Sequence, residues 1–286
     1  MLHLFESYKV FLCTTFYIFT ILTKNKPLKE KIMFKKIALA AALTASASFA
    51  TWDYFPILDG GKGQAELDVA YFKIEKLSEL QIAAAARYSI TPNFELGIGI
   101  PFLLYAAYDG ESYDDVAGLG KIQLMTRYQF TPNVSAFVDF ILPTCGDNTC
   151  DDDGAFAFHF GAQYSQKFGI VNFGSELGLQ LETAGDDDVT PPWELNIGVE
   201  ADFEVNPVFV PYVGLETHTL LGKYSYKGDD ASKSYTGKTG FDPYFGFTAN
   251  ITPQVYAGAQ LRFGIGEDYY GENTLMTLTA KVGFNF

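Results

Sequence analysis

The sequence predicts an all-β protein, specifically a transmembrane antiparallel β-barrel of about 12 strands. Three observations predict this fold. From Gln64 onward, apolar and polar residues alternate along most of the chain, which is the pattern of strands with one apolar face. The alternating segments are about ten residues long, the length that crosses a bilayer at a tilt. Short turns also alternate with long loops rich in Asp and Gly, as in bacterial barrels.

A soluble β-sandwich is the alternative fold, since its strands alternate too. Sandwich strands are usually shorter, however, at about 5–6 residues. Strands within lipid must close into a barrel, because an open edge would leave backbone groups without hydrogen-bond partners. The strand length therefore favours the barrel.

Residues 33–50 are predicted to be a signal peptide. A basic start, Met33-Phe34-Lys35-Lys36, precedes the small and apolar run from Ile37 to Ala47. The sequence Ser48-Phe49-Ala50 then places small residues three and one before a cut, which is typical of signal-peptide cleavage. The mature chain is therefore expected to begin at Thr51.

Residues 1–32 are expected to be a non-native upstream extension, with Met33 as the true start. Signal peptides rarely carry such an extension, which here holds an apolar run from Val10 to Leu22 and a basic patch from Lys24 to Lys31. The alternative is that the apolar run anchors the chain in a membrane. At 13 residues it is short for a helical span, which needs about 20.

The chain carries a net charge of −14, and the residues after position 50 are more acidic still. They hold 13 basic and 32 acidic residues, a net charge of −19. Such a surface repels the phosphates of nucleic acid. We therefore expect no nucleic-acid partner.

Cys145 and Cys150 remain after removal of the leader. They flank Gly146-Asp147-Asn148-Thr149, a run of turn-forming residues. An exported protein passes through an oxidising compartment, so we predict a disulfide bond that closes a small external loop.

Twelve segments between residues 64 and 286 alternate in this way, and this range is the predicted barrel. On each of them, no charged residue falls on the apolar face. We therefore expect the apolar faces to contact lipid and the polar faces to line the interior. The predicted strands cover residues 64–71, 79–88, 93–102, 121–130, 134–140, 156–165, 171–182, 193–203, 212–218, 244–251, 255–263 and 276–286.

The connections indicate which end of the barrel faces the periplasm. Thr91-Pro92-Asn93, Thr131-Pro132-Asn133 and Thr252-Pro253-Gln254 are short turns, expected on the periplasmic side. Residues 103–117, 143–154, 183–192 and 221–240 are long loops, expected outside. An even strand number also places both barrel termini at the periplasm. Residues 51–63 would then form either a periplasmic tail or a segment inside the lumen.

The polar faces carry eleven acidic and five basic residues. One interpretation is a cation-leaning pore, with acidic walls beside a basic cluster. The other is cross-strand ion pairing within a filled interior. The predicted lumen charges are Glu66, Asp68, Glu79, Arg87, Glu95, Lys121, Arg127, Asp139, Glu176, Glu182, Glu194, Glu200, Asp202, Glu216, Arg262 and Lys281.

An enzyme, a metal site and a cofactor are not expected. A twelve-stranded outer-membrane phospholipase exists, but its chemistry needs a histidine, a serine and an orienting amide on the outer surface. His159 and His218 are assigned to inner faces, and no Gly-x-Ser-x-Gly occurs. The acidic runs lack the spacing of a calcium loop.

The end of the chain, Ala280 to Phe286, resembles the terminal strand of outer-membrane barrels. The resemblance lies in the final aromatic Phe286, with Phe284 and Val282 two and four residues before it. It implies that these three residues are read by the barrel assembly machinery. It also implies that the protein lies in the bacterial outer membrane, in contact with lipid and lipopolysaccharide.

The central chain resembles a family of outer-membrane channels labelled after the meta pathway of phenol degradation. The resemblance lies in Gly118-Leu119-Gly120, in Leu142-Pro143-Thr144 and in the Thr-Pro-Asn turns. The family usually has a glycine after the Pro-Thr, whereas here Cys145 precedes Gly146. The resemblance implies a channel for passive passage of small polar or aromatic solutes that the sequence does not identify. The alternative is a closed structural or surface-interaction barrel without transport.

Overall fold

The computed structural model describes residues 52, 54–113, 116–145, 154–185, 188–230 and 234–286. The predicted upstream extension, the signal peptide and Cys150 lie outside these residues. The cleavage site and the disulfide bond therefore stay predictions.

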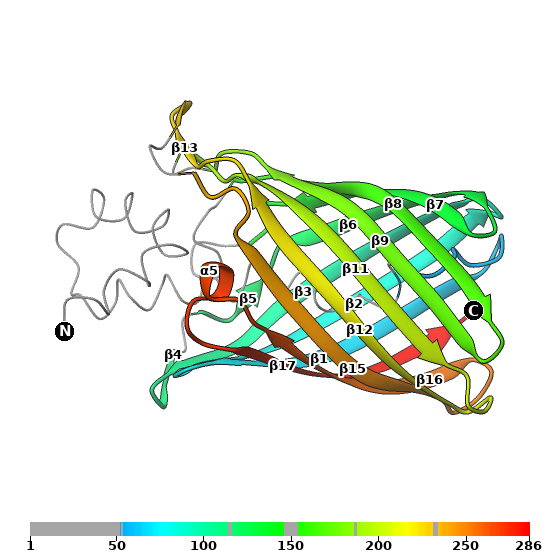
Figure 1. The fold of residues 1–286 in the computed structure, drawn as a ribbon. Helices are drawn as coiled ribbons and strands as arrows, with labels where there is room; N and C mark the ends of the chain where they lie inside the picture. Colours follow the sequence, from blue (N-terminus) through cyan, green and yellow to red (C-terminus); the bar gives the residue numbers. More distant parts are fainter. Residues whose placement is uncertain (1–51, 53, 114–115, 146–153, 186–187, 231–233) are drawn as a thin grey trace.

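The predicted fold is confirmed: twelve long antiparallel strands form a closed barrel (Figure 1). Each long strand pairs with its neighbours along the chain, and β1 closes the barrel on β17, from Gln64 opposite Asn285 to Lys73 opposite Met276. The wall consists of β1 (Gly63–Ile74), β2 (Leu77–Thr91), β3 (Phe94–Tyr108), β6 (Ile122–Thr131), β7 (Val134–Leu142), β8 (Ala157–Phe168), β9 (Val171–Glu182), β11 (Trp193–Phe203), β12 (Phe209–Leu221), β15 (Thr239–Asn250), β16 (Val255–Gly264) and β17 (Leu275–Asn285).

The wall is apolar outside and polar inside. Leu177 on β9 is 55% exposed, whereas Glu200 on the adjacent β11 is 1% exposed. A soluble protein would bury the leucine and expose the glutamate. The inversion follows from the solvent, because lipid covers the outer face and polar groups gather inside.

Strand β3 is longer than predicted, and the expected loop 103–117 is wrong at its start. Leu80 pairs with Tyr105 and Gln81 with Leu103, so Leu104 is an extra residue in the pairing of β2 and β3. This β-bulge interrupts the alternation, which made the strand seem to end early. The true connection begins at Asp109 and contains β4 (Glu111–Tyr113) and β5 (Gly118–Leu119).

The two ends of the barrel differ. One end holds the short turns and the C-terminus, and the other holds the longer connections (Figure 1). The longer connections carry a small sheet of β10 (Val189–Thr190), β13 (Ser225–Tyr226) and β14 (Asp229–Asp230), together with helix α5 (Glu267–Tyr270). No helix of the described residues is long and apolar enough to span a membrane.

Phe286 ties the end of the barrel to its beginning. Its backbone exchanges two hydrogen bonds with Gly63, at 2.7 and 2.9 Å. The Phe286 ring also covers the α-carbon of Gly63, where an added Cβ would lie 2.3 Å from the ring. The closing edge of the barrel therefore ends in an aromatic contact.

We expect Phe286→Ala to lower the fraction of assembled barrel, because the closing edge loses the ring that packs on Gly63. Heat-dependent mobility on denaturing gels measures that fraction in outer-membrane extracts. Ile251→Ala is the control, since Ile251 is a 63% exposed residue of a short turn. Equal assembly of the two variants would contradict the role given to Phe286.

Candidate functional site

The sixteen residues predicted to carry lumen charge lie on the inner face of the wall, buried or partly buried. The five basic residues each have an acidic partner on another strand or loop. The ion-pair interpretation therefore describes the basic residues well. Their pairs are Arg127 with Asp139, Arg262 with Glu216, Lys121 with Glu182 at 3.0 Å, Arg87 with Glu95 at 3.6 Å, and Lys281 with Glu66 at 3.7 Å.

Several inner carboxylates have oxygens without a hydrogen-bond partner. Among the described residues, no group donates a hydrogen bond to either oxygen of Asp68, Glu79 or Glu200, nor to one oxygen each of Glu66 and Asp202. A buried carboxylate without a partner is costly, because it loses the hydration of its charge. The inner face therefore holds more carboxyl groups than its basic residues pair with.

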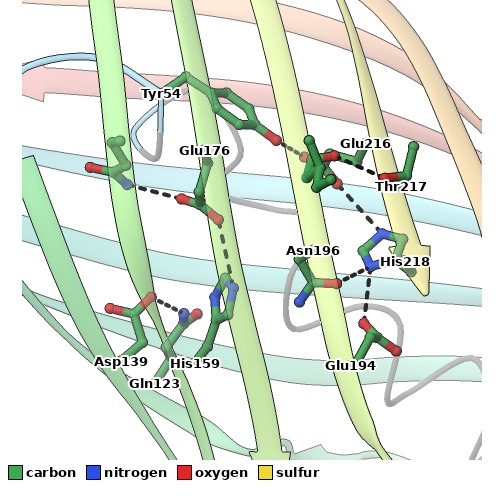
Figure 2. A network of polar contacts seen from close by, with 12 residues as sticks. Tyr54, Gln123, Asp139, His159, Glu176, Glu194, Asn196, Glu216, Thr217 and His218 are labelled. Atoms are coloured by element: carbon green, nitrogen blue, oxygen red, sulfur yellow. Dashed lines mark hydrogen bonds and ion pairs between the residues drawn. The ribbon is translucent and has the colours of Figure 1, made fainter. Parts of the chain in front are cut away.

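Glu216 on β12 lies at the centre of a polar network in the lumen, with Tyr54 and His218 beside it (Figure 2). Glu216 accepts two hydrogen bonds from the Arg262 guanidinium, one of them at 3.0 Å. Arg262 also lies 3.7 Å from Asp242 and packs over the Tyr244 ring, 4.6 Å from its centroid. Arg262 is therefore enclosed by two carboxylates and an aromatic face.

His218 extends this network toward β11. Its Nδ1 lies 3.0 Å from Glu194 Oε1 and 2.8 Å from Asn196 Oδ1. Its Nε2 lies 3.9 Å from Glu216 and 3.8 Å from Asp242. His218 is thus held inside the barrel by polar groups of three strands.

Glu216, His218 and Asp242 place their ligand atoms within 4.8 Å of one another, which is close enough for a metal ion. Arg262 already supplies a positive charge in the same place. A divalent ion would be repelled by this fixed guanidinium. We therefore assign these residues to an ion-pair network.

A second inner network surrounds the other histidine. His159 Nε2 lies 3.6 Å from Glu176, which accepts a hydrogen bond from Gln163 at 2.9 Å. The His159 ring packs edge-on against Phe137, with 4.8 Å between centroids. Both histidines of the described residues therefore point inward, as their strand faces predicted.

Helix α5 places two tyrosines into the lumen at the end of the barrel that holds the longer connections. The Tyr269 hydroxyl donates to Glu194 at 2.6 Å, and its ring stacks on His218. The Tyr270 hydroxyl donates to Asp242 at 2.5 Å. Burial, together with these carboxylates, raises the pKa of both tyrosines well above its usual value, so both stay neutral donors. Sequence reasoning missed them, because a four-residue helix has no periodicity to detect.

The segment before β1 also lies in the lumen. Trp52 lies under the Arg87 guanidinium, with 4.9 Å to the ring centroid, and the Tyr54 hydroxyl donates to Glu216. Farther along, the backbone N–H of Ile57 donates to Gln129 and that of Leu58 donates to Glu95, each at 3.0 Å. The sequence analysis gave two alternatives for residues 51–63, a segment inside the lumen or a periplasmic tail. The contacts of the described residues are those of a lumen segment.

Asp242 is an inner acidic residue that sequence reasoning missed. It is 5% exposed and lies two residues before Tyr244, which was assigned to the inner face. Extending the alternation by one step would have found it. Pro243, a residue that rarely occurs inside strands, lies between them and argued against that extension.

Comparisons with known proteins agree with the fold. A family model described as "Putative MetA-pathway of phenol degradation" matches residues 44–280. Among curated protein sequences, none matches the chain.

Three solved structures are similar to this chain. An outer membrane channel from Pseudomonas putida F1 is 14% identical, with a TM-score of 0.62, and the match covers 81% of this chain and 98% of that one. The translocator domain of the autotransporter NalP from Neisseria meningitidis is 11% identical, with a TM-score of 0.50 and coverages of 88% and 98%. The CymD monoaromatic hydrocarbon channel is 10% identical, with a TM-score of 0.44 and coverages of 87% and 92%.

The family match spans most of the chain, and the barrel has the apolar belt of a protein that crosses a bilayer. The chain therefore belongs to the family of the putative MetA pathway of phenol degradation and is a β-barrel protein of the bacterial outer membrane.

Proposed function

We propose that the barrel is a channel for the passive passage of small polar or aromatic solutes, and that its lumen favours cations. The observation that supports this most is the excess of carboxylates on the inner face. With Asp242, twelve inner acidic residues stand against five basic ones in the part of the chain that the structure describes. The family match and the likeness to a structure named as an outer membrane channel also support the proposal.

The carboxylates around Lys281 would set the charge preference. Glu66 and Asp68 project from β1, Glu200 and Asp202 from β11, and Lys281 lies within electrostatic range of Glu66, Asp68 and Glu200. Fixed charge of one sign along a narrow path raises the local concentration of the opposite ion. Lys281 acts there as a tethered counter-ion that lowers the net charge.

The inner tyrosines would suit aromatic solutes. Tyr212, Tyr244 and Tyr256 line the inner face of β12, β15 and β16, and the Tyr256 hydroxyl donates to Glu66 at 2.8 Å. A lumen wall that combines aromatic side chains with carboxylates would suit a solute that has an aromatic ring and a hydrogen-bond donor.

Reversal potentials across a planar bilayer under a salt gradient test the proposal. We expect cation preference, which Lys281→Met strengthens and the pair Glu200→Gln with Asp202→Asn weakens. The preference should fall with salt, because the screening length drops from about 10 Å at 0.1 M to about 3 Å at 1 M. Lys76→Met is the control: it removes a positive charge from an exposed turn, where Lys76 pairs with Asp109. Anion preference would overturn the proposal.

A closed barrel without transport is the second candidate. The observation that favours it is the filling of the lumen by Tyr54 and by the α5 tyrosines. Absence of conductance, both in the native chain and after these side chains are truncated, would favour the closed barrel.

A further inference from the structure

Inner tyrosines of this barrel lie over glycines of the adjacent strand. Tyr244 lies over Gly214, Tyr212 over Gly246 and Tyr256 over Gly283, and each pair is directly opposed in the strand register. An added Cβ on these glycines would lie 2.1, 2.6 and 1.9 Å from the respective ring. Each glycine therefore leaves a recess of ring size, which a wall tyrosine fills.

Gly198 forms a similar recess, but no wall tyrosine fills it. Its partners in the register are Glu216 on β12 and Glu176 on β9. The ring over Gly198 belongs to Tyr54, and an added Cβ would lie 2.4 Å from both its Cε1 and its hydroxyl. The Tyr54 backbone lies just as close to Gly174 on β9. A Cβ added to Gly174 would lie 2.4 Å from the Tyr54 carbonyl oxygen.

The recess has walls of its own and a hydrogen-bond acceptor. Tyr212 and Tyr244 pack with Tyr54 in one buried cluster. Glu216 accepts the Tyr54 hydroxyl (Figure 2). Two hydrogen bonds from Arg262 hold the Glu216 carboxylate in place. These groups belong to strands β11, β12, β15 and β16, so they stay in place when Tyr54 leaves. Tyr54 itself belongs to the segment before β1 and not to the wall.

We propose that the recess over Gly198 is a binding site for a small aromatic ring that carries a hydroxyl donor, and that Tyr54 occupies this site in the resting barrel. The ring would lie on Gly198, and its hydroxyl would donate to Glu216. A solute of this class and Tyr54 then compete for one place, so that solute binding releases the segment that fills the lumen. The proposed effect of the site on solute passage rests on the proposed channel function. The binding of the aromatic ring does not depend on it.

The free side chain of tyrosine, 4-methylphenol, is the matched probe. Calorimetry of the full chain in detergent should detect binding to Tyr54→Ala, and at least about tenfold weaker binding to the native chain, in which Tyr54 must first leave. The probe 4-methylanisole has nearly the same shape but no donor. We expect it to bind Tyr54→Ala at least about tenfold more weakly, because a hydrogen bond to a charged group is lost.

Two variants control for the recess. Tyr54→Phe keeps a ring in the recess but removes its hydrogen bond to Glu216, so the probe should bind more tightly than to the native chain and more weakly than to Tyr54→Ala. In Tyr54→Ala with Gly198→Val, a side chain refills the recess, and binding should disappear. Heat-dependent gel mobility checks that each variant is assembled. If Tyr54→Ala does not assemble, limited proteolysis of the native chain replaces calorimetry. Saturating 4-methylphenol should then expose the segment before β1 to cleavage, and 4-methylanisole should not.

Conductance separates this site from the proposed channel. We expect Tyr54→Ala to conduct more than the native chain, and saturating 4-methylphenol to raise the conductance of the native chain toward that of the variant, because the probe displaces Tyr54. Increased conductance without probe binding would overturn the site and leave the channel standing. Probe binding without conductance would overturn the channel and leave the site standing. Equal binding of the two probes would overturn the assignment of Glu216 as acceptor.

Discussion

Replacing Arg262 by methionine is expected to destabilise the barrel by about 3–5 kcal/mol, which is the usual cost of removing one partner from a buried ion pair. Arg262 is 3% exposed and is bonded to Glu216, with Asp242 at 3.7 Å. Methionine fills much of the same volume but removes the guanidinium that lies between the Glu216 and Asp242 carboxylates. The Tyr244 face also loses the guanidinium stacked on it.

Denaturant titration of the barrel in phospholipid vesicles would measure this loss. Arg262→Met combined with Glu216→Gln should recover part of it, because one of the two charges is gone. Lys238→Met is the matched control, since its partner Asp268 is 74% exposed, and it should cost about 1 kcal/mol or less. A similar cost for both single variants would show that the Arg262 network contributes no more than a surface ion pair.

Leu177→Arg is expected to cost about 2–4 kcal/mol, because it places a charge on the lipid-facing side near the middle of a strand. Leu177 lies at the centre of β9 and is 55% exposed on the outer face. If the protein were soluble, the same substitution would place arginine in water and cost almost nothing. The loss of unfolding free energy therefore shows whether lipid or water covers the outer face of β9.

Ile170→Arg is the matched control for Leu177→Arg. Ile170 is 58% exposed in the short turn before β9, at the edge of the bilayer, where such a charge costs about 0–1 kcal/mol. The unfolding free energies of both variants in vesicles make the comparison. Equal costs at the two positions would contradict the placement of β9 across the membrane.

The wall of the barrel was predictable because lipid imposes a strict rule on each residue. Outward positions within the bilayer must avoid charge, so the contrast between Leu177 and Glu176 is clear enough to assign both faces. The bulge at Leu104 was not predictable, because the consecutive apolar residues Leu103, Leu104 and Tyr105 hide the phase of the strand. Period-two reasoning cannot place an extra residue that follows no period.

The centre of the lumen was only partly predictable. Glu216, Arg262 and Glu194 were found from their strand faces, but their partners Tyr54, Tyr269 and Tyr270 come from segments outside the twelve strands. The alternation of polar and apolar residues along a strand cannot predict that a loop folds back into the barrel. Nor does it say which charges meet, since pairing depends on side chains that cross the interior.

The ladder between β1 and β17 joins the first and the last strand of the wall. During synthesis, these strands appear at opposite ends of the process, so the ring cannot form until the ribosome has finished the chain. A chain truncated by a premature stop would keep the unpaired edges of an open sheet, whichever strand it ended on. Such fragments are not stabilised by partial closure. We therefore expect quality-control proteases to degrade them as unfolded chains, and no smaller barrels to accumulate.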